Sequence, residues 1–120
     1  MTLPDVDPAR LEEELLADEE VLLNLARNGD RPEIPRSIDV SFRGYDEDLT
    51  RLENDAAKFG FTVLEREENE DGEISLFLAR TQKADPASIK ALTIECLQIE
   101  ILYDLEFEGW GCTAETGEGG

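Results

Sequence analysis

Residues 103–111 read Tyr-Asp-Leu-Glu-Phe-Glu-Gly-Trp-Gly, and this stretch organises the rest of the chain. Apolar and acidic side chains alternate at four successive positions: Leu105, Glu106, Phe107 and Glu108. Such alternation is typical of a short strand with one buried face. The stretch then places Trp110, the single tryptophan of the chain, between Gly109 and Gly111. We therefore expect the last strand of the domain here, with a tryptophan at its exit.

The elements before this strand follow from periodicity and from residues that begin or end helices. Residues 37–43 alternate between polar and apolar side chains, which predicts a strand packed on one side. Asp7-Pro8 and Asp85-Pro86 each combine a capping acid with a proline at the first helical position. Asn28-Gly29 and Gly60 are typical helix ends. The patterns predict helices over 8–27, 46–59 and 86–102, and further strands over 61–64 and 74–79.

The first helix leaves one question open. The phase of its leucines slips near Asp18, so we expect the helix to be interrupted there. The leucines either dock on the domain or form an acidic amphipathic arm that packs on another chain.

The order of elements is one extra helix followed by β-α-β-β-α-β, which predicts an α+β fold, a ferredoxin-like α/β sandwich. A four-stranded antiparallel sheet would carry two helices on one face, with its first and third strands in the middle. We expect three segments: an acidic helix with a proline-containing linker over 1–35, the ferredoxin-like domain over 36–111, and a disordered tail over 112–120.

Charge restricts the partners. The net charge is −19, from 30 acidic and 11 basic residues. Such a chain repels nucleic-acid phosphates and anionic membranes, and it favours basic partners. The N-terminus has no basic, apolar signal sequence, and no apolar run is long enough to span a membrane, so a cytoplasmic location is expected. The two cysteines, Cys96 and Cys112, do not form the spacing pattern of a disulfide framework, although the sequence leaves a disulfide between them as an alternative.

The residue types argue against catalysis. The chain has no histidine, which removes the commonest general base and most zinc sites. The acidic run that ends in the predicted hairpin turn Asp71-Gly72 lacks the spacing of a calcium-binding loop, so a solvated tip is expected. RNA-binding domains of this fold stack bases on aromatic residues of the central strands, whereas Phe77 is the one aromatic expected there. We expect no catalytic residue, metal ion, cofactor or direct nucleic-acid contact.

Trp110 has two interpretations. It either packs over an edge of the sheet and closes the core, or it is a partly exposed anchor for a partner, since tryptophan is enriched at interface hot spots. Both hold if one face of the ring is buried.

Three stretches resemble a known family, the regulator of ribonuclease E activity B proteins, which are ribonuclease E inhibitors of bacteria. Residues 103–111 are similar to the family's Phe-Asp-Val-Glu-Tyr-Asp-Gly-Trp-Gly. Residues 58–63, Lys-Phe-Gly-Phe-Thr-Val, are similar to its Lys-Leu-Gly-Tyr-Glu-Val, and the acidic Asp71-Gly72 hairpin also agrees. The resemblance runs from Glu19 to Gly111. It implies a ferredoxin-like sandwich in a cytoplasmic, non-enzymatic protein that binds ribonuclease E and modulates its activity.

The sequence and the resemblance together favour a regulator of RNA degradation that binds a basic, arginine-rich region of a ribonuclease. The residues expected at that contact are acids and the tryptophan stretch: Glu70, Asp71, Glu106, Glu108, Gly109, Trp110 and Gly111. Two alternatives stay open. One is a sensor domain for a small molecule or a metal, and the other is a homo-oligomeric module that pairs through its edge strands. The oligomeric state does not follow from the sequence.

Overall fold

A computed structural model describes residues 3–117 of the chain. Its elements follow one another in this order: α1 (Pro8–Arg27), β1 (Arg36–Gly44), α2 (Asp46–Asp55), the 3-10 turn η1 (Ala56–Phe59), β2 (Thr62–Glu68), β3 (Ile74–Gln82), α3 (Pro86–Tyr103) and β4 (Glu106–Gly111). After α1, this is the predicted β-α-β-β-α-β series.

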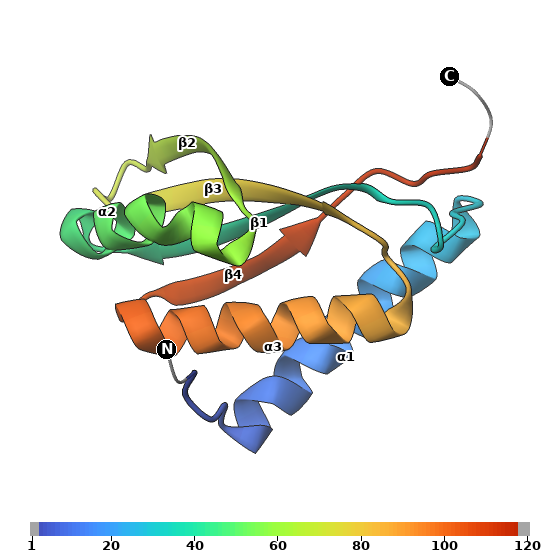
Figure 1. Ribbon diagram of the computed structural model, residues 1–120, viewed down its shortest axis with the longest axis horizontal. Coiled ribbons are helices and arrows are strands. Elements are labelled where there is room, and N and C mark those ends of the chain that lie inside the picture. The colour runs from blue at the N-terminus through green and yellow to red at the C-terminus, as the bar shows by residue number, and fades with distance from the viewer. Residues whose placement is uncertain (1–2, 118–120) are drawn as a thin grey trace.

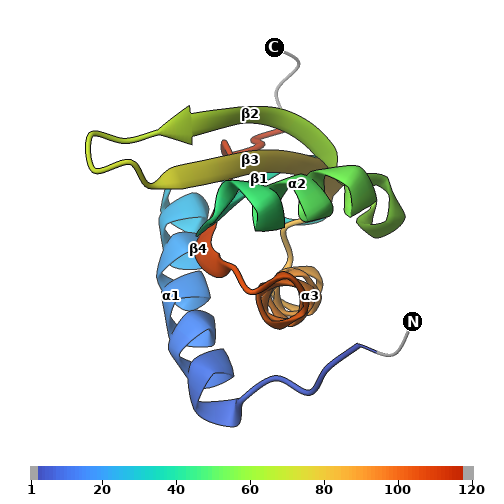
Figure 2. The same ribbon diagram turned by 90° about the vertical axis from the view of Figure 1, so that its left-hand side faces the viewer.

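The four strands form one antiparallel sheet in the order β2-β3-β1-β4. The first and third strands therefore lie in the middle, as predicted, and β2 and β4 form the edges. Ile38, Val40 and Phe42 of β1 are almost completely buried, together with Leu76 and Leu78 of β3. The expected α+β sandwich is confirmed, with its core between this face of the sheet and the helices (Figures 1 and 2).

The helix ends agree with the chemistry of their sequences. The Asp7 carboxylate accepts from the backbone amide of Ala9 at 3.2 Å, and the Asp85 carboxylate accepts from that of Ser88 at 3.1 Å. Gly60 ends η1 with φ of 77°, a left-handed conformation that costs glycine little. These caps pair amides that would otherwise have no partner in the first turn.

One expectation about the helices is wrong. The first helix was expected to break near Asp18, but α1 continues from Pro8 to Arg27. The side chain of Asp18 is buried and hydrogen-bonded there, so the slip in apolar phase marks a polar residue inside the molecule. The helix expected over 46–59 does end at Phe59, and its last turn, from Ala56, takes the 3-10 form that is common at helix ends.

The first helix packs against the side of α3 and passes the edge strand β4, as Figure 2 shows. Its docking is incomplete, because Leu25 is its one buried leucine while Leu16 and Leu23 are more than half exposed. Beyond β4, the backbone amide of Glu115 donates to the Asp30 carboxylate at 2.7 Å. Residues 118–120 of the predicted tail lie outside the described residues.

Both cysteines are free thiols in the structure. Cys96 is fully buried in α3, and burial raises the pKa of its thiol. No helix within residues 3–117 is long and apolar enough to cross a membrane.

Candidate functional site

The tryptophan stretch contains a β-bulge. Phe107 pairs with Phe42 and Trp110 pairs with Val40, so Glu108 and Gly109 together lie opposite the single residue Ser41. Gly109 adopts φ of 114°, a conformation that side chains with a Cβ rarely enter. A bulge moves the next residue to the other face of a strand. Trp110 therefore lies on the same face as Phe107, toward the helices, which simple alternation does not predict.

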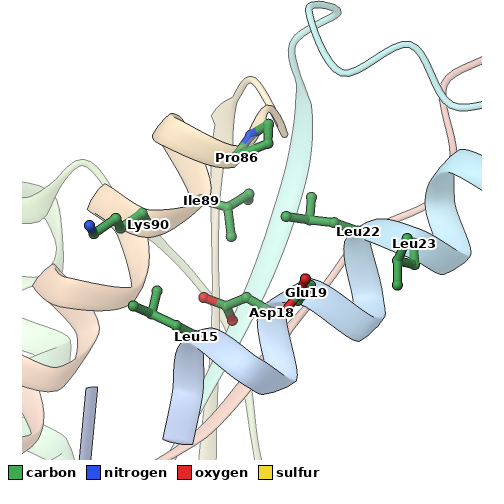
Figure 3. A pocket seen from close by; sticks show the side chains of 8 residues that line it. All are labelled: Leu15, Asp18, Glu19, Leu22, Leu23, Pro86, Ile89 and Lys90. Carbon is green, nitrogen blue, oxygen red and sulfur yellow. The ribbon is translucent and has the colours of Figure 1, made fainter. Parts of the chain in front are cut away.

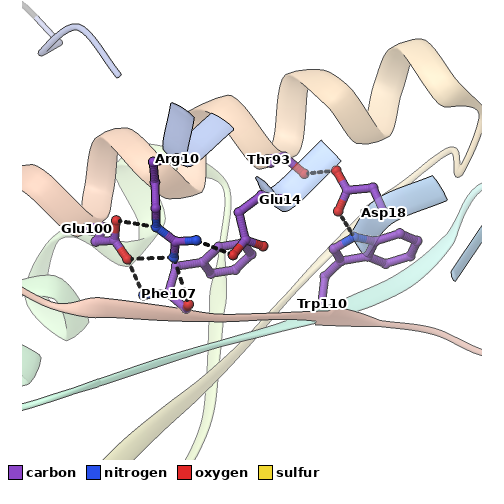
Figure 4. Close-up of polar contacts among 7 residues, drawn as sticks. All are labelled: Arg10, Glu14, Asp18, Thr93, Glu100, Phe107 and Trp110. Carbon is purple, nitrogen blue, oxygen red and sulfur yellow. Dashed lines mark hydrogen bonds and ion pairs between the residues drawn. The ribbon is translucent and has the colours of Figure 1, made fainter. Parts of the chain in front are cut away.

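The indole of Trp110 is held by a buried acid. Its Nε1–H donates to Oδ1 of Asp18 at 2.7 Å, and the hydroxyl of Thr93 donates to Oδ2 at 2.5 Å (Figure 4). Asp18 and Thr93 are 4% and 0% exposed. The carboxylate thus joins α1, α3 and β4 through two charge-assisted hydrogen bonds. The interpretation of Trp110 as a packing residue accounts for these contacts.

Glu106 and Glu108 lie on the opposite face of β4, away from the helices. Cross-strand pairing places four residues in one row across the sheet: Glu67, Ser75, Arg43 and Glu106. Arg43 forms ion pairs with Glu106 and, at 2.8 Å, with Glu73 of the hairpin. The hydroxyl of Ser75 donates to Oε1 of Glu108 at 2.7 Å.

We call this surface the acidic sheet face. Its acids lie on both edge strands and on β1, around a less charged centre: Asp39, Glu65, Glu67, Glu106 and Glu108, with Arg43, Ser41, Ser75 and Phe77 between them. The five acids are all exposed. The single cation is already paired with two carboxylates, so the face keeps a negative charge that a basic partner can neutralise.

The hairpin tip reaches the same end of the sheet. Asn69 closes the turn, because its Oδ1 accepts from the amides of Asp71 and Glu73, both at 2.9 Å. Asp71 lines a hollow of about 290 Å³ together with Arg43, Tyr45 and Glu106. The structure therefore brings Asp71 close to Glu106, whereas Glu70 is exposed at the tip and does not line this hollow.

The outer edge of β4 is partly occupied. The backbone amide of Phe107 donates to the Glu100 carboxylate at 2.8 Å, and its carbonyl accepts from Arg10 at 3.4 Å (Figure 4). Arg10 is bonded to Glu100 at 3.0 Å, and this bond is the largest cause of a raised pKa of the guanidinium. These side chains block strand pairing at Phe107, which weighs against self-association through this part of the edge.

A polar hollow of about 510 Å³ connects the acidic sheet face to α1. Its lining combines side chains of both surfaces: Arg10, Glu13, Glu14, Arg43, Glu100, Glu106, Phe107 and Glu108. The negative surface thus continues around the edge of β4 onto the first helix.

The structure separates the predicted residues by role. Glu106, Glu108 and Asp71 lie together on the surface, Gly109 shapes the bulge, and Trp110 turns inward. Sequence reasoning missed the partners that make this arrangement: Asp18, Thr93, Arg10, Arg43 and Glu100. The phase slip at Asp18 was the one signal for them in the sequence. No group of three or more acids or cysteines in the described part of the chain is placed to hold a metal ion.

Comparison with known proteins agrees with the resemblance seen in the sequence. A family model described as Regulator of ribonuclease activity B matches residues 16–112. The match covers most of the chain, including Asp18, the acidic sheet face and the tryptophan bulge. No curated protein gives a significant match.

Proposed function

The chain belongs to the Regulator of ribonuclease activity B family, and from that premise we propose that it is a non-enzymatic regulator of RNA degradation. It acts in the cytoplasm, where it binds a basic, arginine-rich region of a ribonuclease E-like enzyme. The family match carries this proposal. The acidic sheet face supplies the physical rationale for the basic partner.

The contact we propose begins at Glu106 and Glu108. Both side chains are exposed, they lie on one face, and Arg43 is the one cation on that face. A guanidinium can bind a carboxylate through two parallel hydrogen bonds, so arginine suits such a surface better than lysine does. Phe77 on the same face adds an aromatic ring on which a guanidinium can stack.

Asp71 and the acids of α1 extend this contact. The hollow at the hairpin and the hollow beside Arg10 adjoin Glu106 on different sides. A basic segment crossing β4 would meet negative groups along its whole path. Opposite charges over such a length speed association and make it sensitive to salt.

The same face argues against direct RNA binding. A sheet that binds RNA presents several aromatic residues and basic side chains. Here Phe77 is flanked by acids on both neighbouring rows, which would repel phosphates. A protein partner fits this surface better than a nucleic acid does.

The test measures binding of a labelled arginine-rich peptide from the ribonuclease by fluorescence anisotropy. The chain should bind at about 50 mM salt and lose most of its affinity at about 0.5 M. The double variant Glu106→Gln/Glu108→Gln should bind about ten-fold more weakly at the lower salt, since exposed ion pairs contribute about 0.2–1 kcal/mol each and those at an interface contribute more.

The matched control is Glu33→Gln/Glu47→Gln, which removes the same charge at two exposed positions away from the acidic sheet face. It should change the affinity by less than about two-fold. Equal losses in the two double variants would show that net charge alone attracts the peptide. Binding that does not depend on salt, or no binding, would contradict the proposed contact.

A further inference from the structure

A second surface lies where α1 crosses α3, and it is apolar. A groove of about 420 Å³ is lined by side chains of both helices: Leu15, Asp18, Glu19, Leu22, Leu23, Pro86, Ile89 and Lys90 (Figure 3). Its volume is in the range of sites that hold ligands or partner side chains. The groove arises because α1 docks on α3 incompletely and leaves Leu23 51% exposed.

The polar groups of the groove do not explain it. Asp18 lies at its floor, but both carboxylate oxygens are already bonded, to Trp110 and to Thr93. Glu19 and Lys90 are exposed at its border. The groove therefore exposes apolar surface to water, and covering it with another apolar surface would be favourable.

The shape of the groove suits a helix. Leu15, Leu22 and Leu23 lie within a stretch of nine residues of α1, a rise of about 12 Å along its axis. Ile89 and Pro86 form the opposite wall from the first turn of α3. A groove between two helices that spans two helical turns is a recurrent site for the apolar stripe of a third helix.

Charge restricts which helix can fit. Between residues 12 and 26, α1 carries six acids and no lysine or arginine: Glu12, Glu13, Glu14, Asp18, Glu19 and Glu20. A second copy of this chain would bring its own net charge of −19 against this border. Glu19 lines the groove on the α1 side and Lys90 on the α3 side, so a helix with lysine or arginine on the side that meets α1 would gain from the acids there.

The described ends of the chain lie elsewhere. The carbonyl of Pro4 accepts from Gln98 near the other end of α3, and Glu115 is bonded to Asp30 beyond the end of α1. Neither segment covers the wall formed by Pro86 and Ile89.

We propose that the α1–α3 groove binds an amphipathic helix of a protein partner, with an apolar stripe seated against Leu15, Leu22 and Leu23 and basic residues beside Glu19. This site lies apart from the acidic sheet face and does not rest on the proposed ribonuclease contact. Together the two surfaces would give the protein two independent points of attachment.

The probe is a fluorescent leucine–lysine peptide of about five helical turns whose leucines follow the helical period. A permuted peptide with the same composition and no helical stripe is the first control. Binding is measured at about 0.5 M salt, where long-range attraction to the acidic chain is largely screened. The periodic peptide should bind at least about ten-fold more tightly than the permuted one.

Leu23→Glu tests the groove, and Leu64→Glu on β2 is its matched control. The two leucines are 51% and 52% exposed, and both changes add one negative charge. Added charge alone would strengthen binding of a lysine-containing peptide. Leu23→Glu should nevertheless weaken it by about ten-fold or more, while Leu64→Glu should stay within about two-fold of the unchanged chain.

Further measurements separate the other outcomes. If Leu23→Glu unfolds the chain, Leu23→Ala is measured in its place, and it should also weaken binding of the periodic peptide. The double variant Glu106→Gln/Glu108→Gln should leave that binding unchanged at high salt. Equal binding of both peptides, or equal effects at Leu23 and Leu64, would overturn the proposal. A dimer of the free chain in sedimentation equilibrium that Leu23→Glu dissociates would assign the groove to a second copy and would also overturn it.

Discussion

Replacing Trp110 by Phe and Asp18 by Ala, singly and together, tests the buried network that fixes α1 to the sheet. The Trp110–Asp18 bond is 2.7 Å long and its acceptor is 4% exposed. A hydrogen bond to a charged group contributes about 1.5–3 kcal/mol to stability. Trp110→Phe keeps most of the ring but removes the donor, so we expect a loss of about 1.5–3 kcal/mol in the free energy of unfolding.

Asp18→Ala has a larger effect, because it removes the acceptor of two donors at once. The Thr93 hydroxyl is 0% exposed and cannot turn to water. Leaving this buried hydroxyl and the partly buried indole N–H of Trp110 unpaired costs about 2–5 kcal/mol in total. Because Trp110→Phe removes one of those donors, the double variant should be less unstable than the sum of the single variants by about 1–2 kcal/mol.

The measurement is urea unfolding followed by far-ultraviolet circular dichroism, since Trp110→Phe removes the only tryptophan and with it the fluorescence signal. Asp18→Asn is the control, because its amide oxygen still accepts from the indole and its amide nitrogen can donate to Thr93. It should lose about 1 kcal/mol. Additive losses, with a coupling below about 0.5 kcal/mol, would refute the view that this bond holds the helix in place.

Two further predictions concern backbone strain and pH. Gly109→Ala should lower the free energy of unfolding by about 1–3 kcal/mol, because the φ of Gly109 is 114° and an alanine there is strained even though nothing lies within 4 Å of its Cβ. Gly111→Ala is the control: its Cβ also meets nothing within 4 Å and its φ is not positive, so the free energy of unfolding in the same urea assay should hardly change. Burial and the hydrogen bond to Asp55, 2.6 Å long, raise the pKa of Tyr103 to about 12. The unfolded phenol ionises first, near pH 10, so its contribution to stability is complete below about pH 10 and is lost as the pH rises toward 12. Tyr103→Phe should remove this part of the alkaline loss in urea unfolding, and an unchanged slope would contradict the assignment.

Local signals were sufficient for the elements of the fold. Strand β1 alternates over its whole length, and both Asp-Pro pairs place a cap and a proline where a helix begins. Because the series of elements fixes the handed connections, the strand order also followed from the sequence. These features depend on residues within a few positions of one another.

The candidate site depends on contacts between distant residues, and for this reason it was predicted less well. Asp18 is bonded to residues 75 and 92 positions away, and no period in α1 reveals partners at such a distance. Either glycine beside Trp110 could have supported a bulge. Only the pairing with Ser41 shows that Gly109 does so, and therefore which face the indole joins.

The position of the bulge changes what a substitution on this strand can report. Glu106 and Glu108 lie on the surface, whereas Trp110, two residues further along, lies on the inner face because the bulge shifts it there. If a Trp110→Ala variant lost binding, the loss could therefore come from a changed binding surface or from altered docking of α1, and this variant alone would not separate the two. Glu106→Gln/Glu108→Gln changes charge at exposed positions and leaves the Asp18 network intact. A partner that is lost in the first variant but retained in the second contacts the α1 side of the molecule, and one that is lost in both contacts the acidic sheet face.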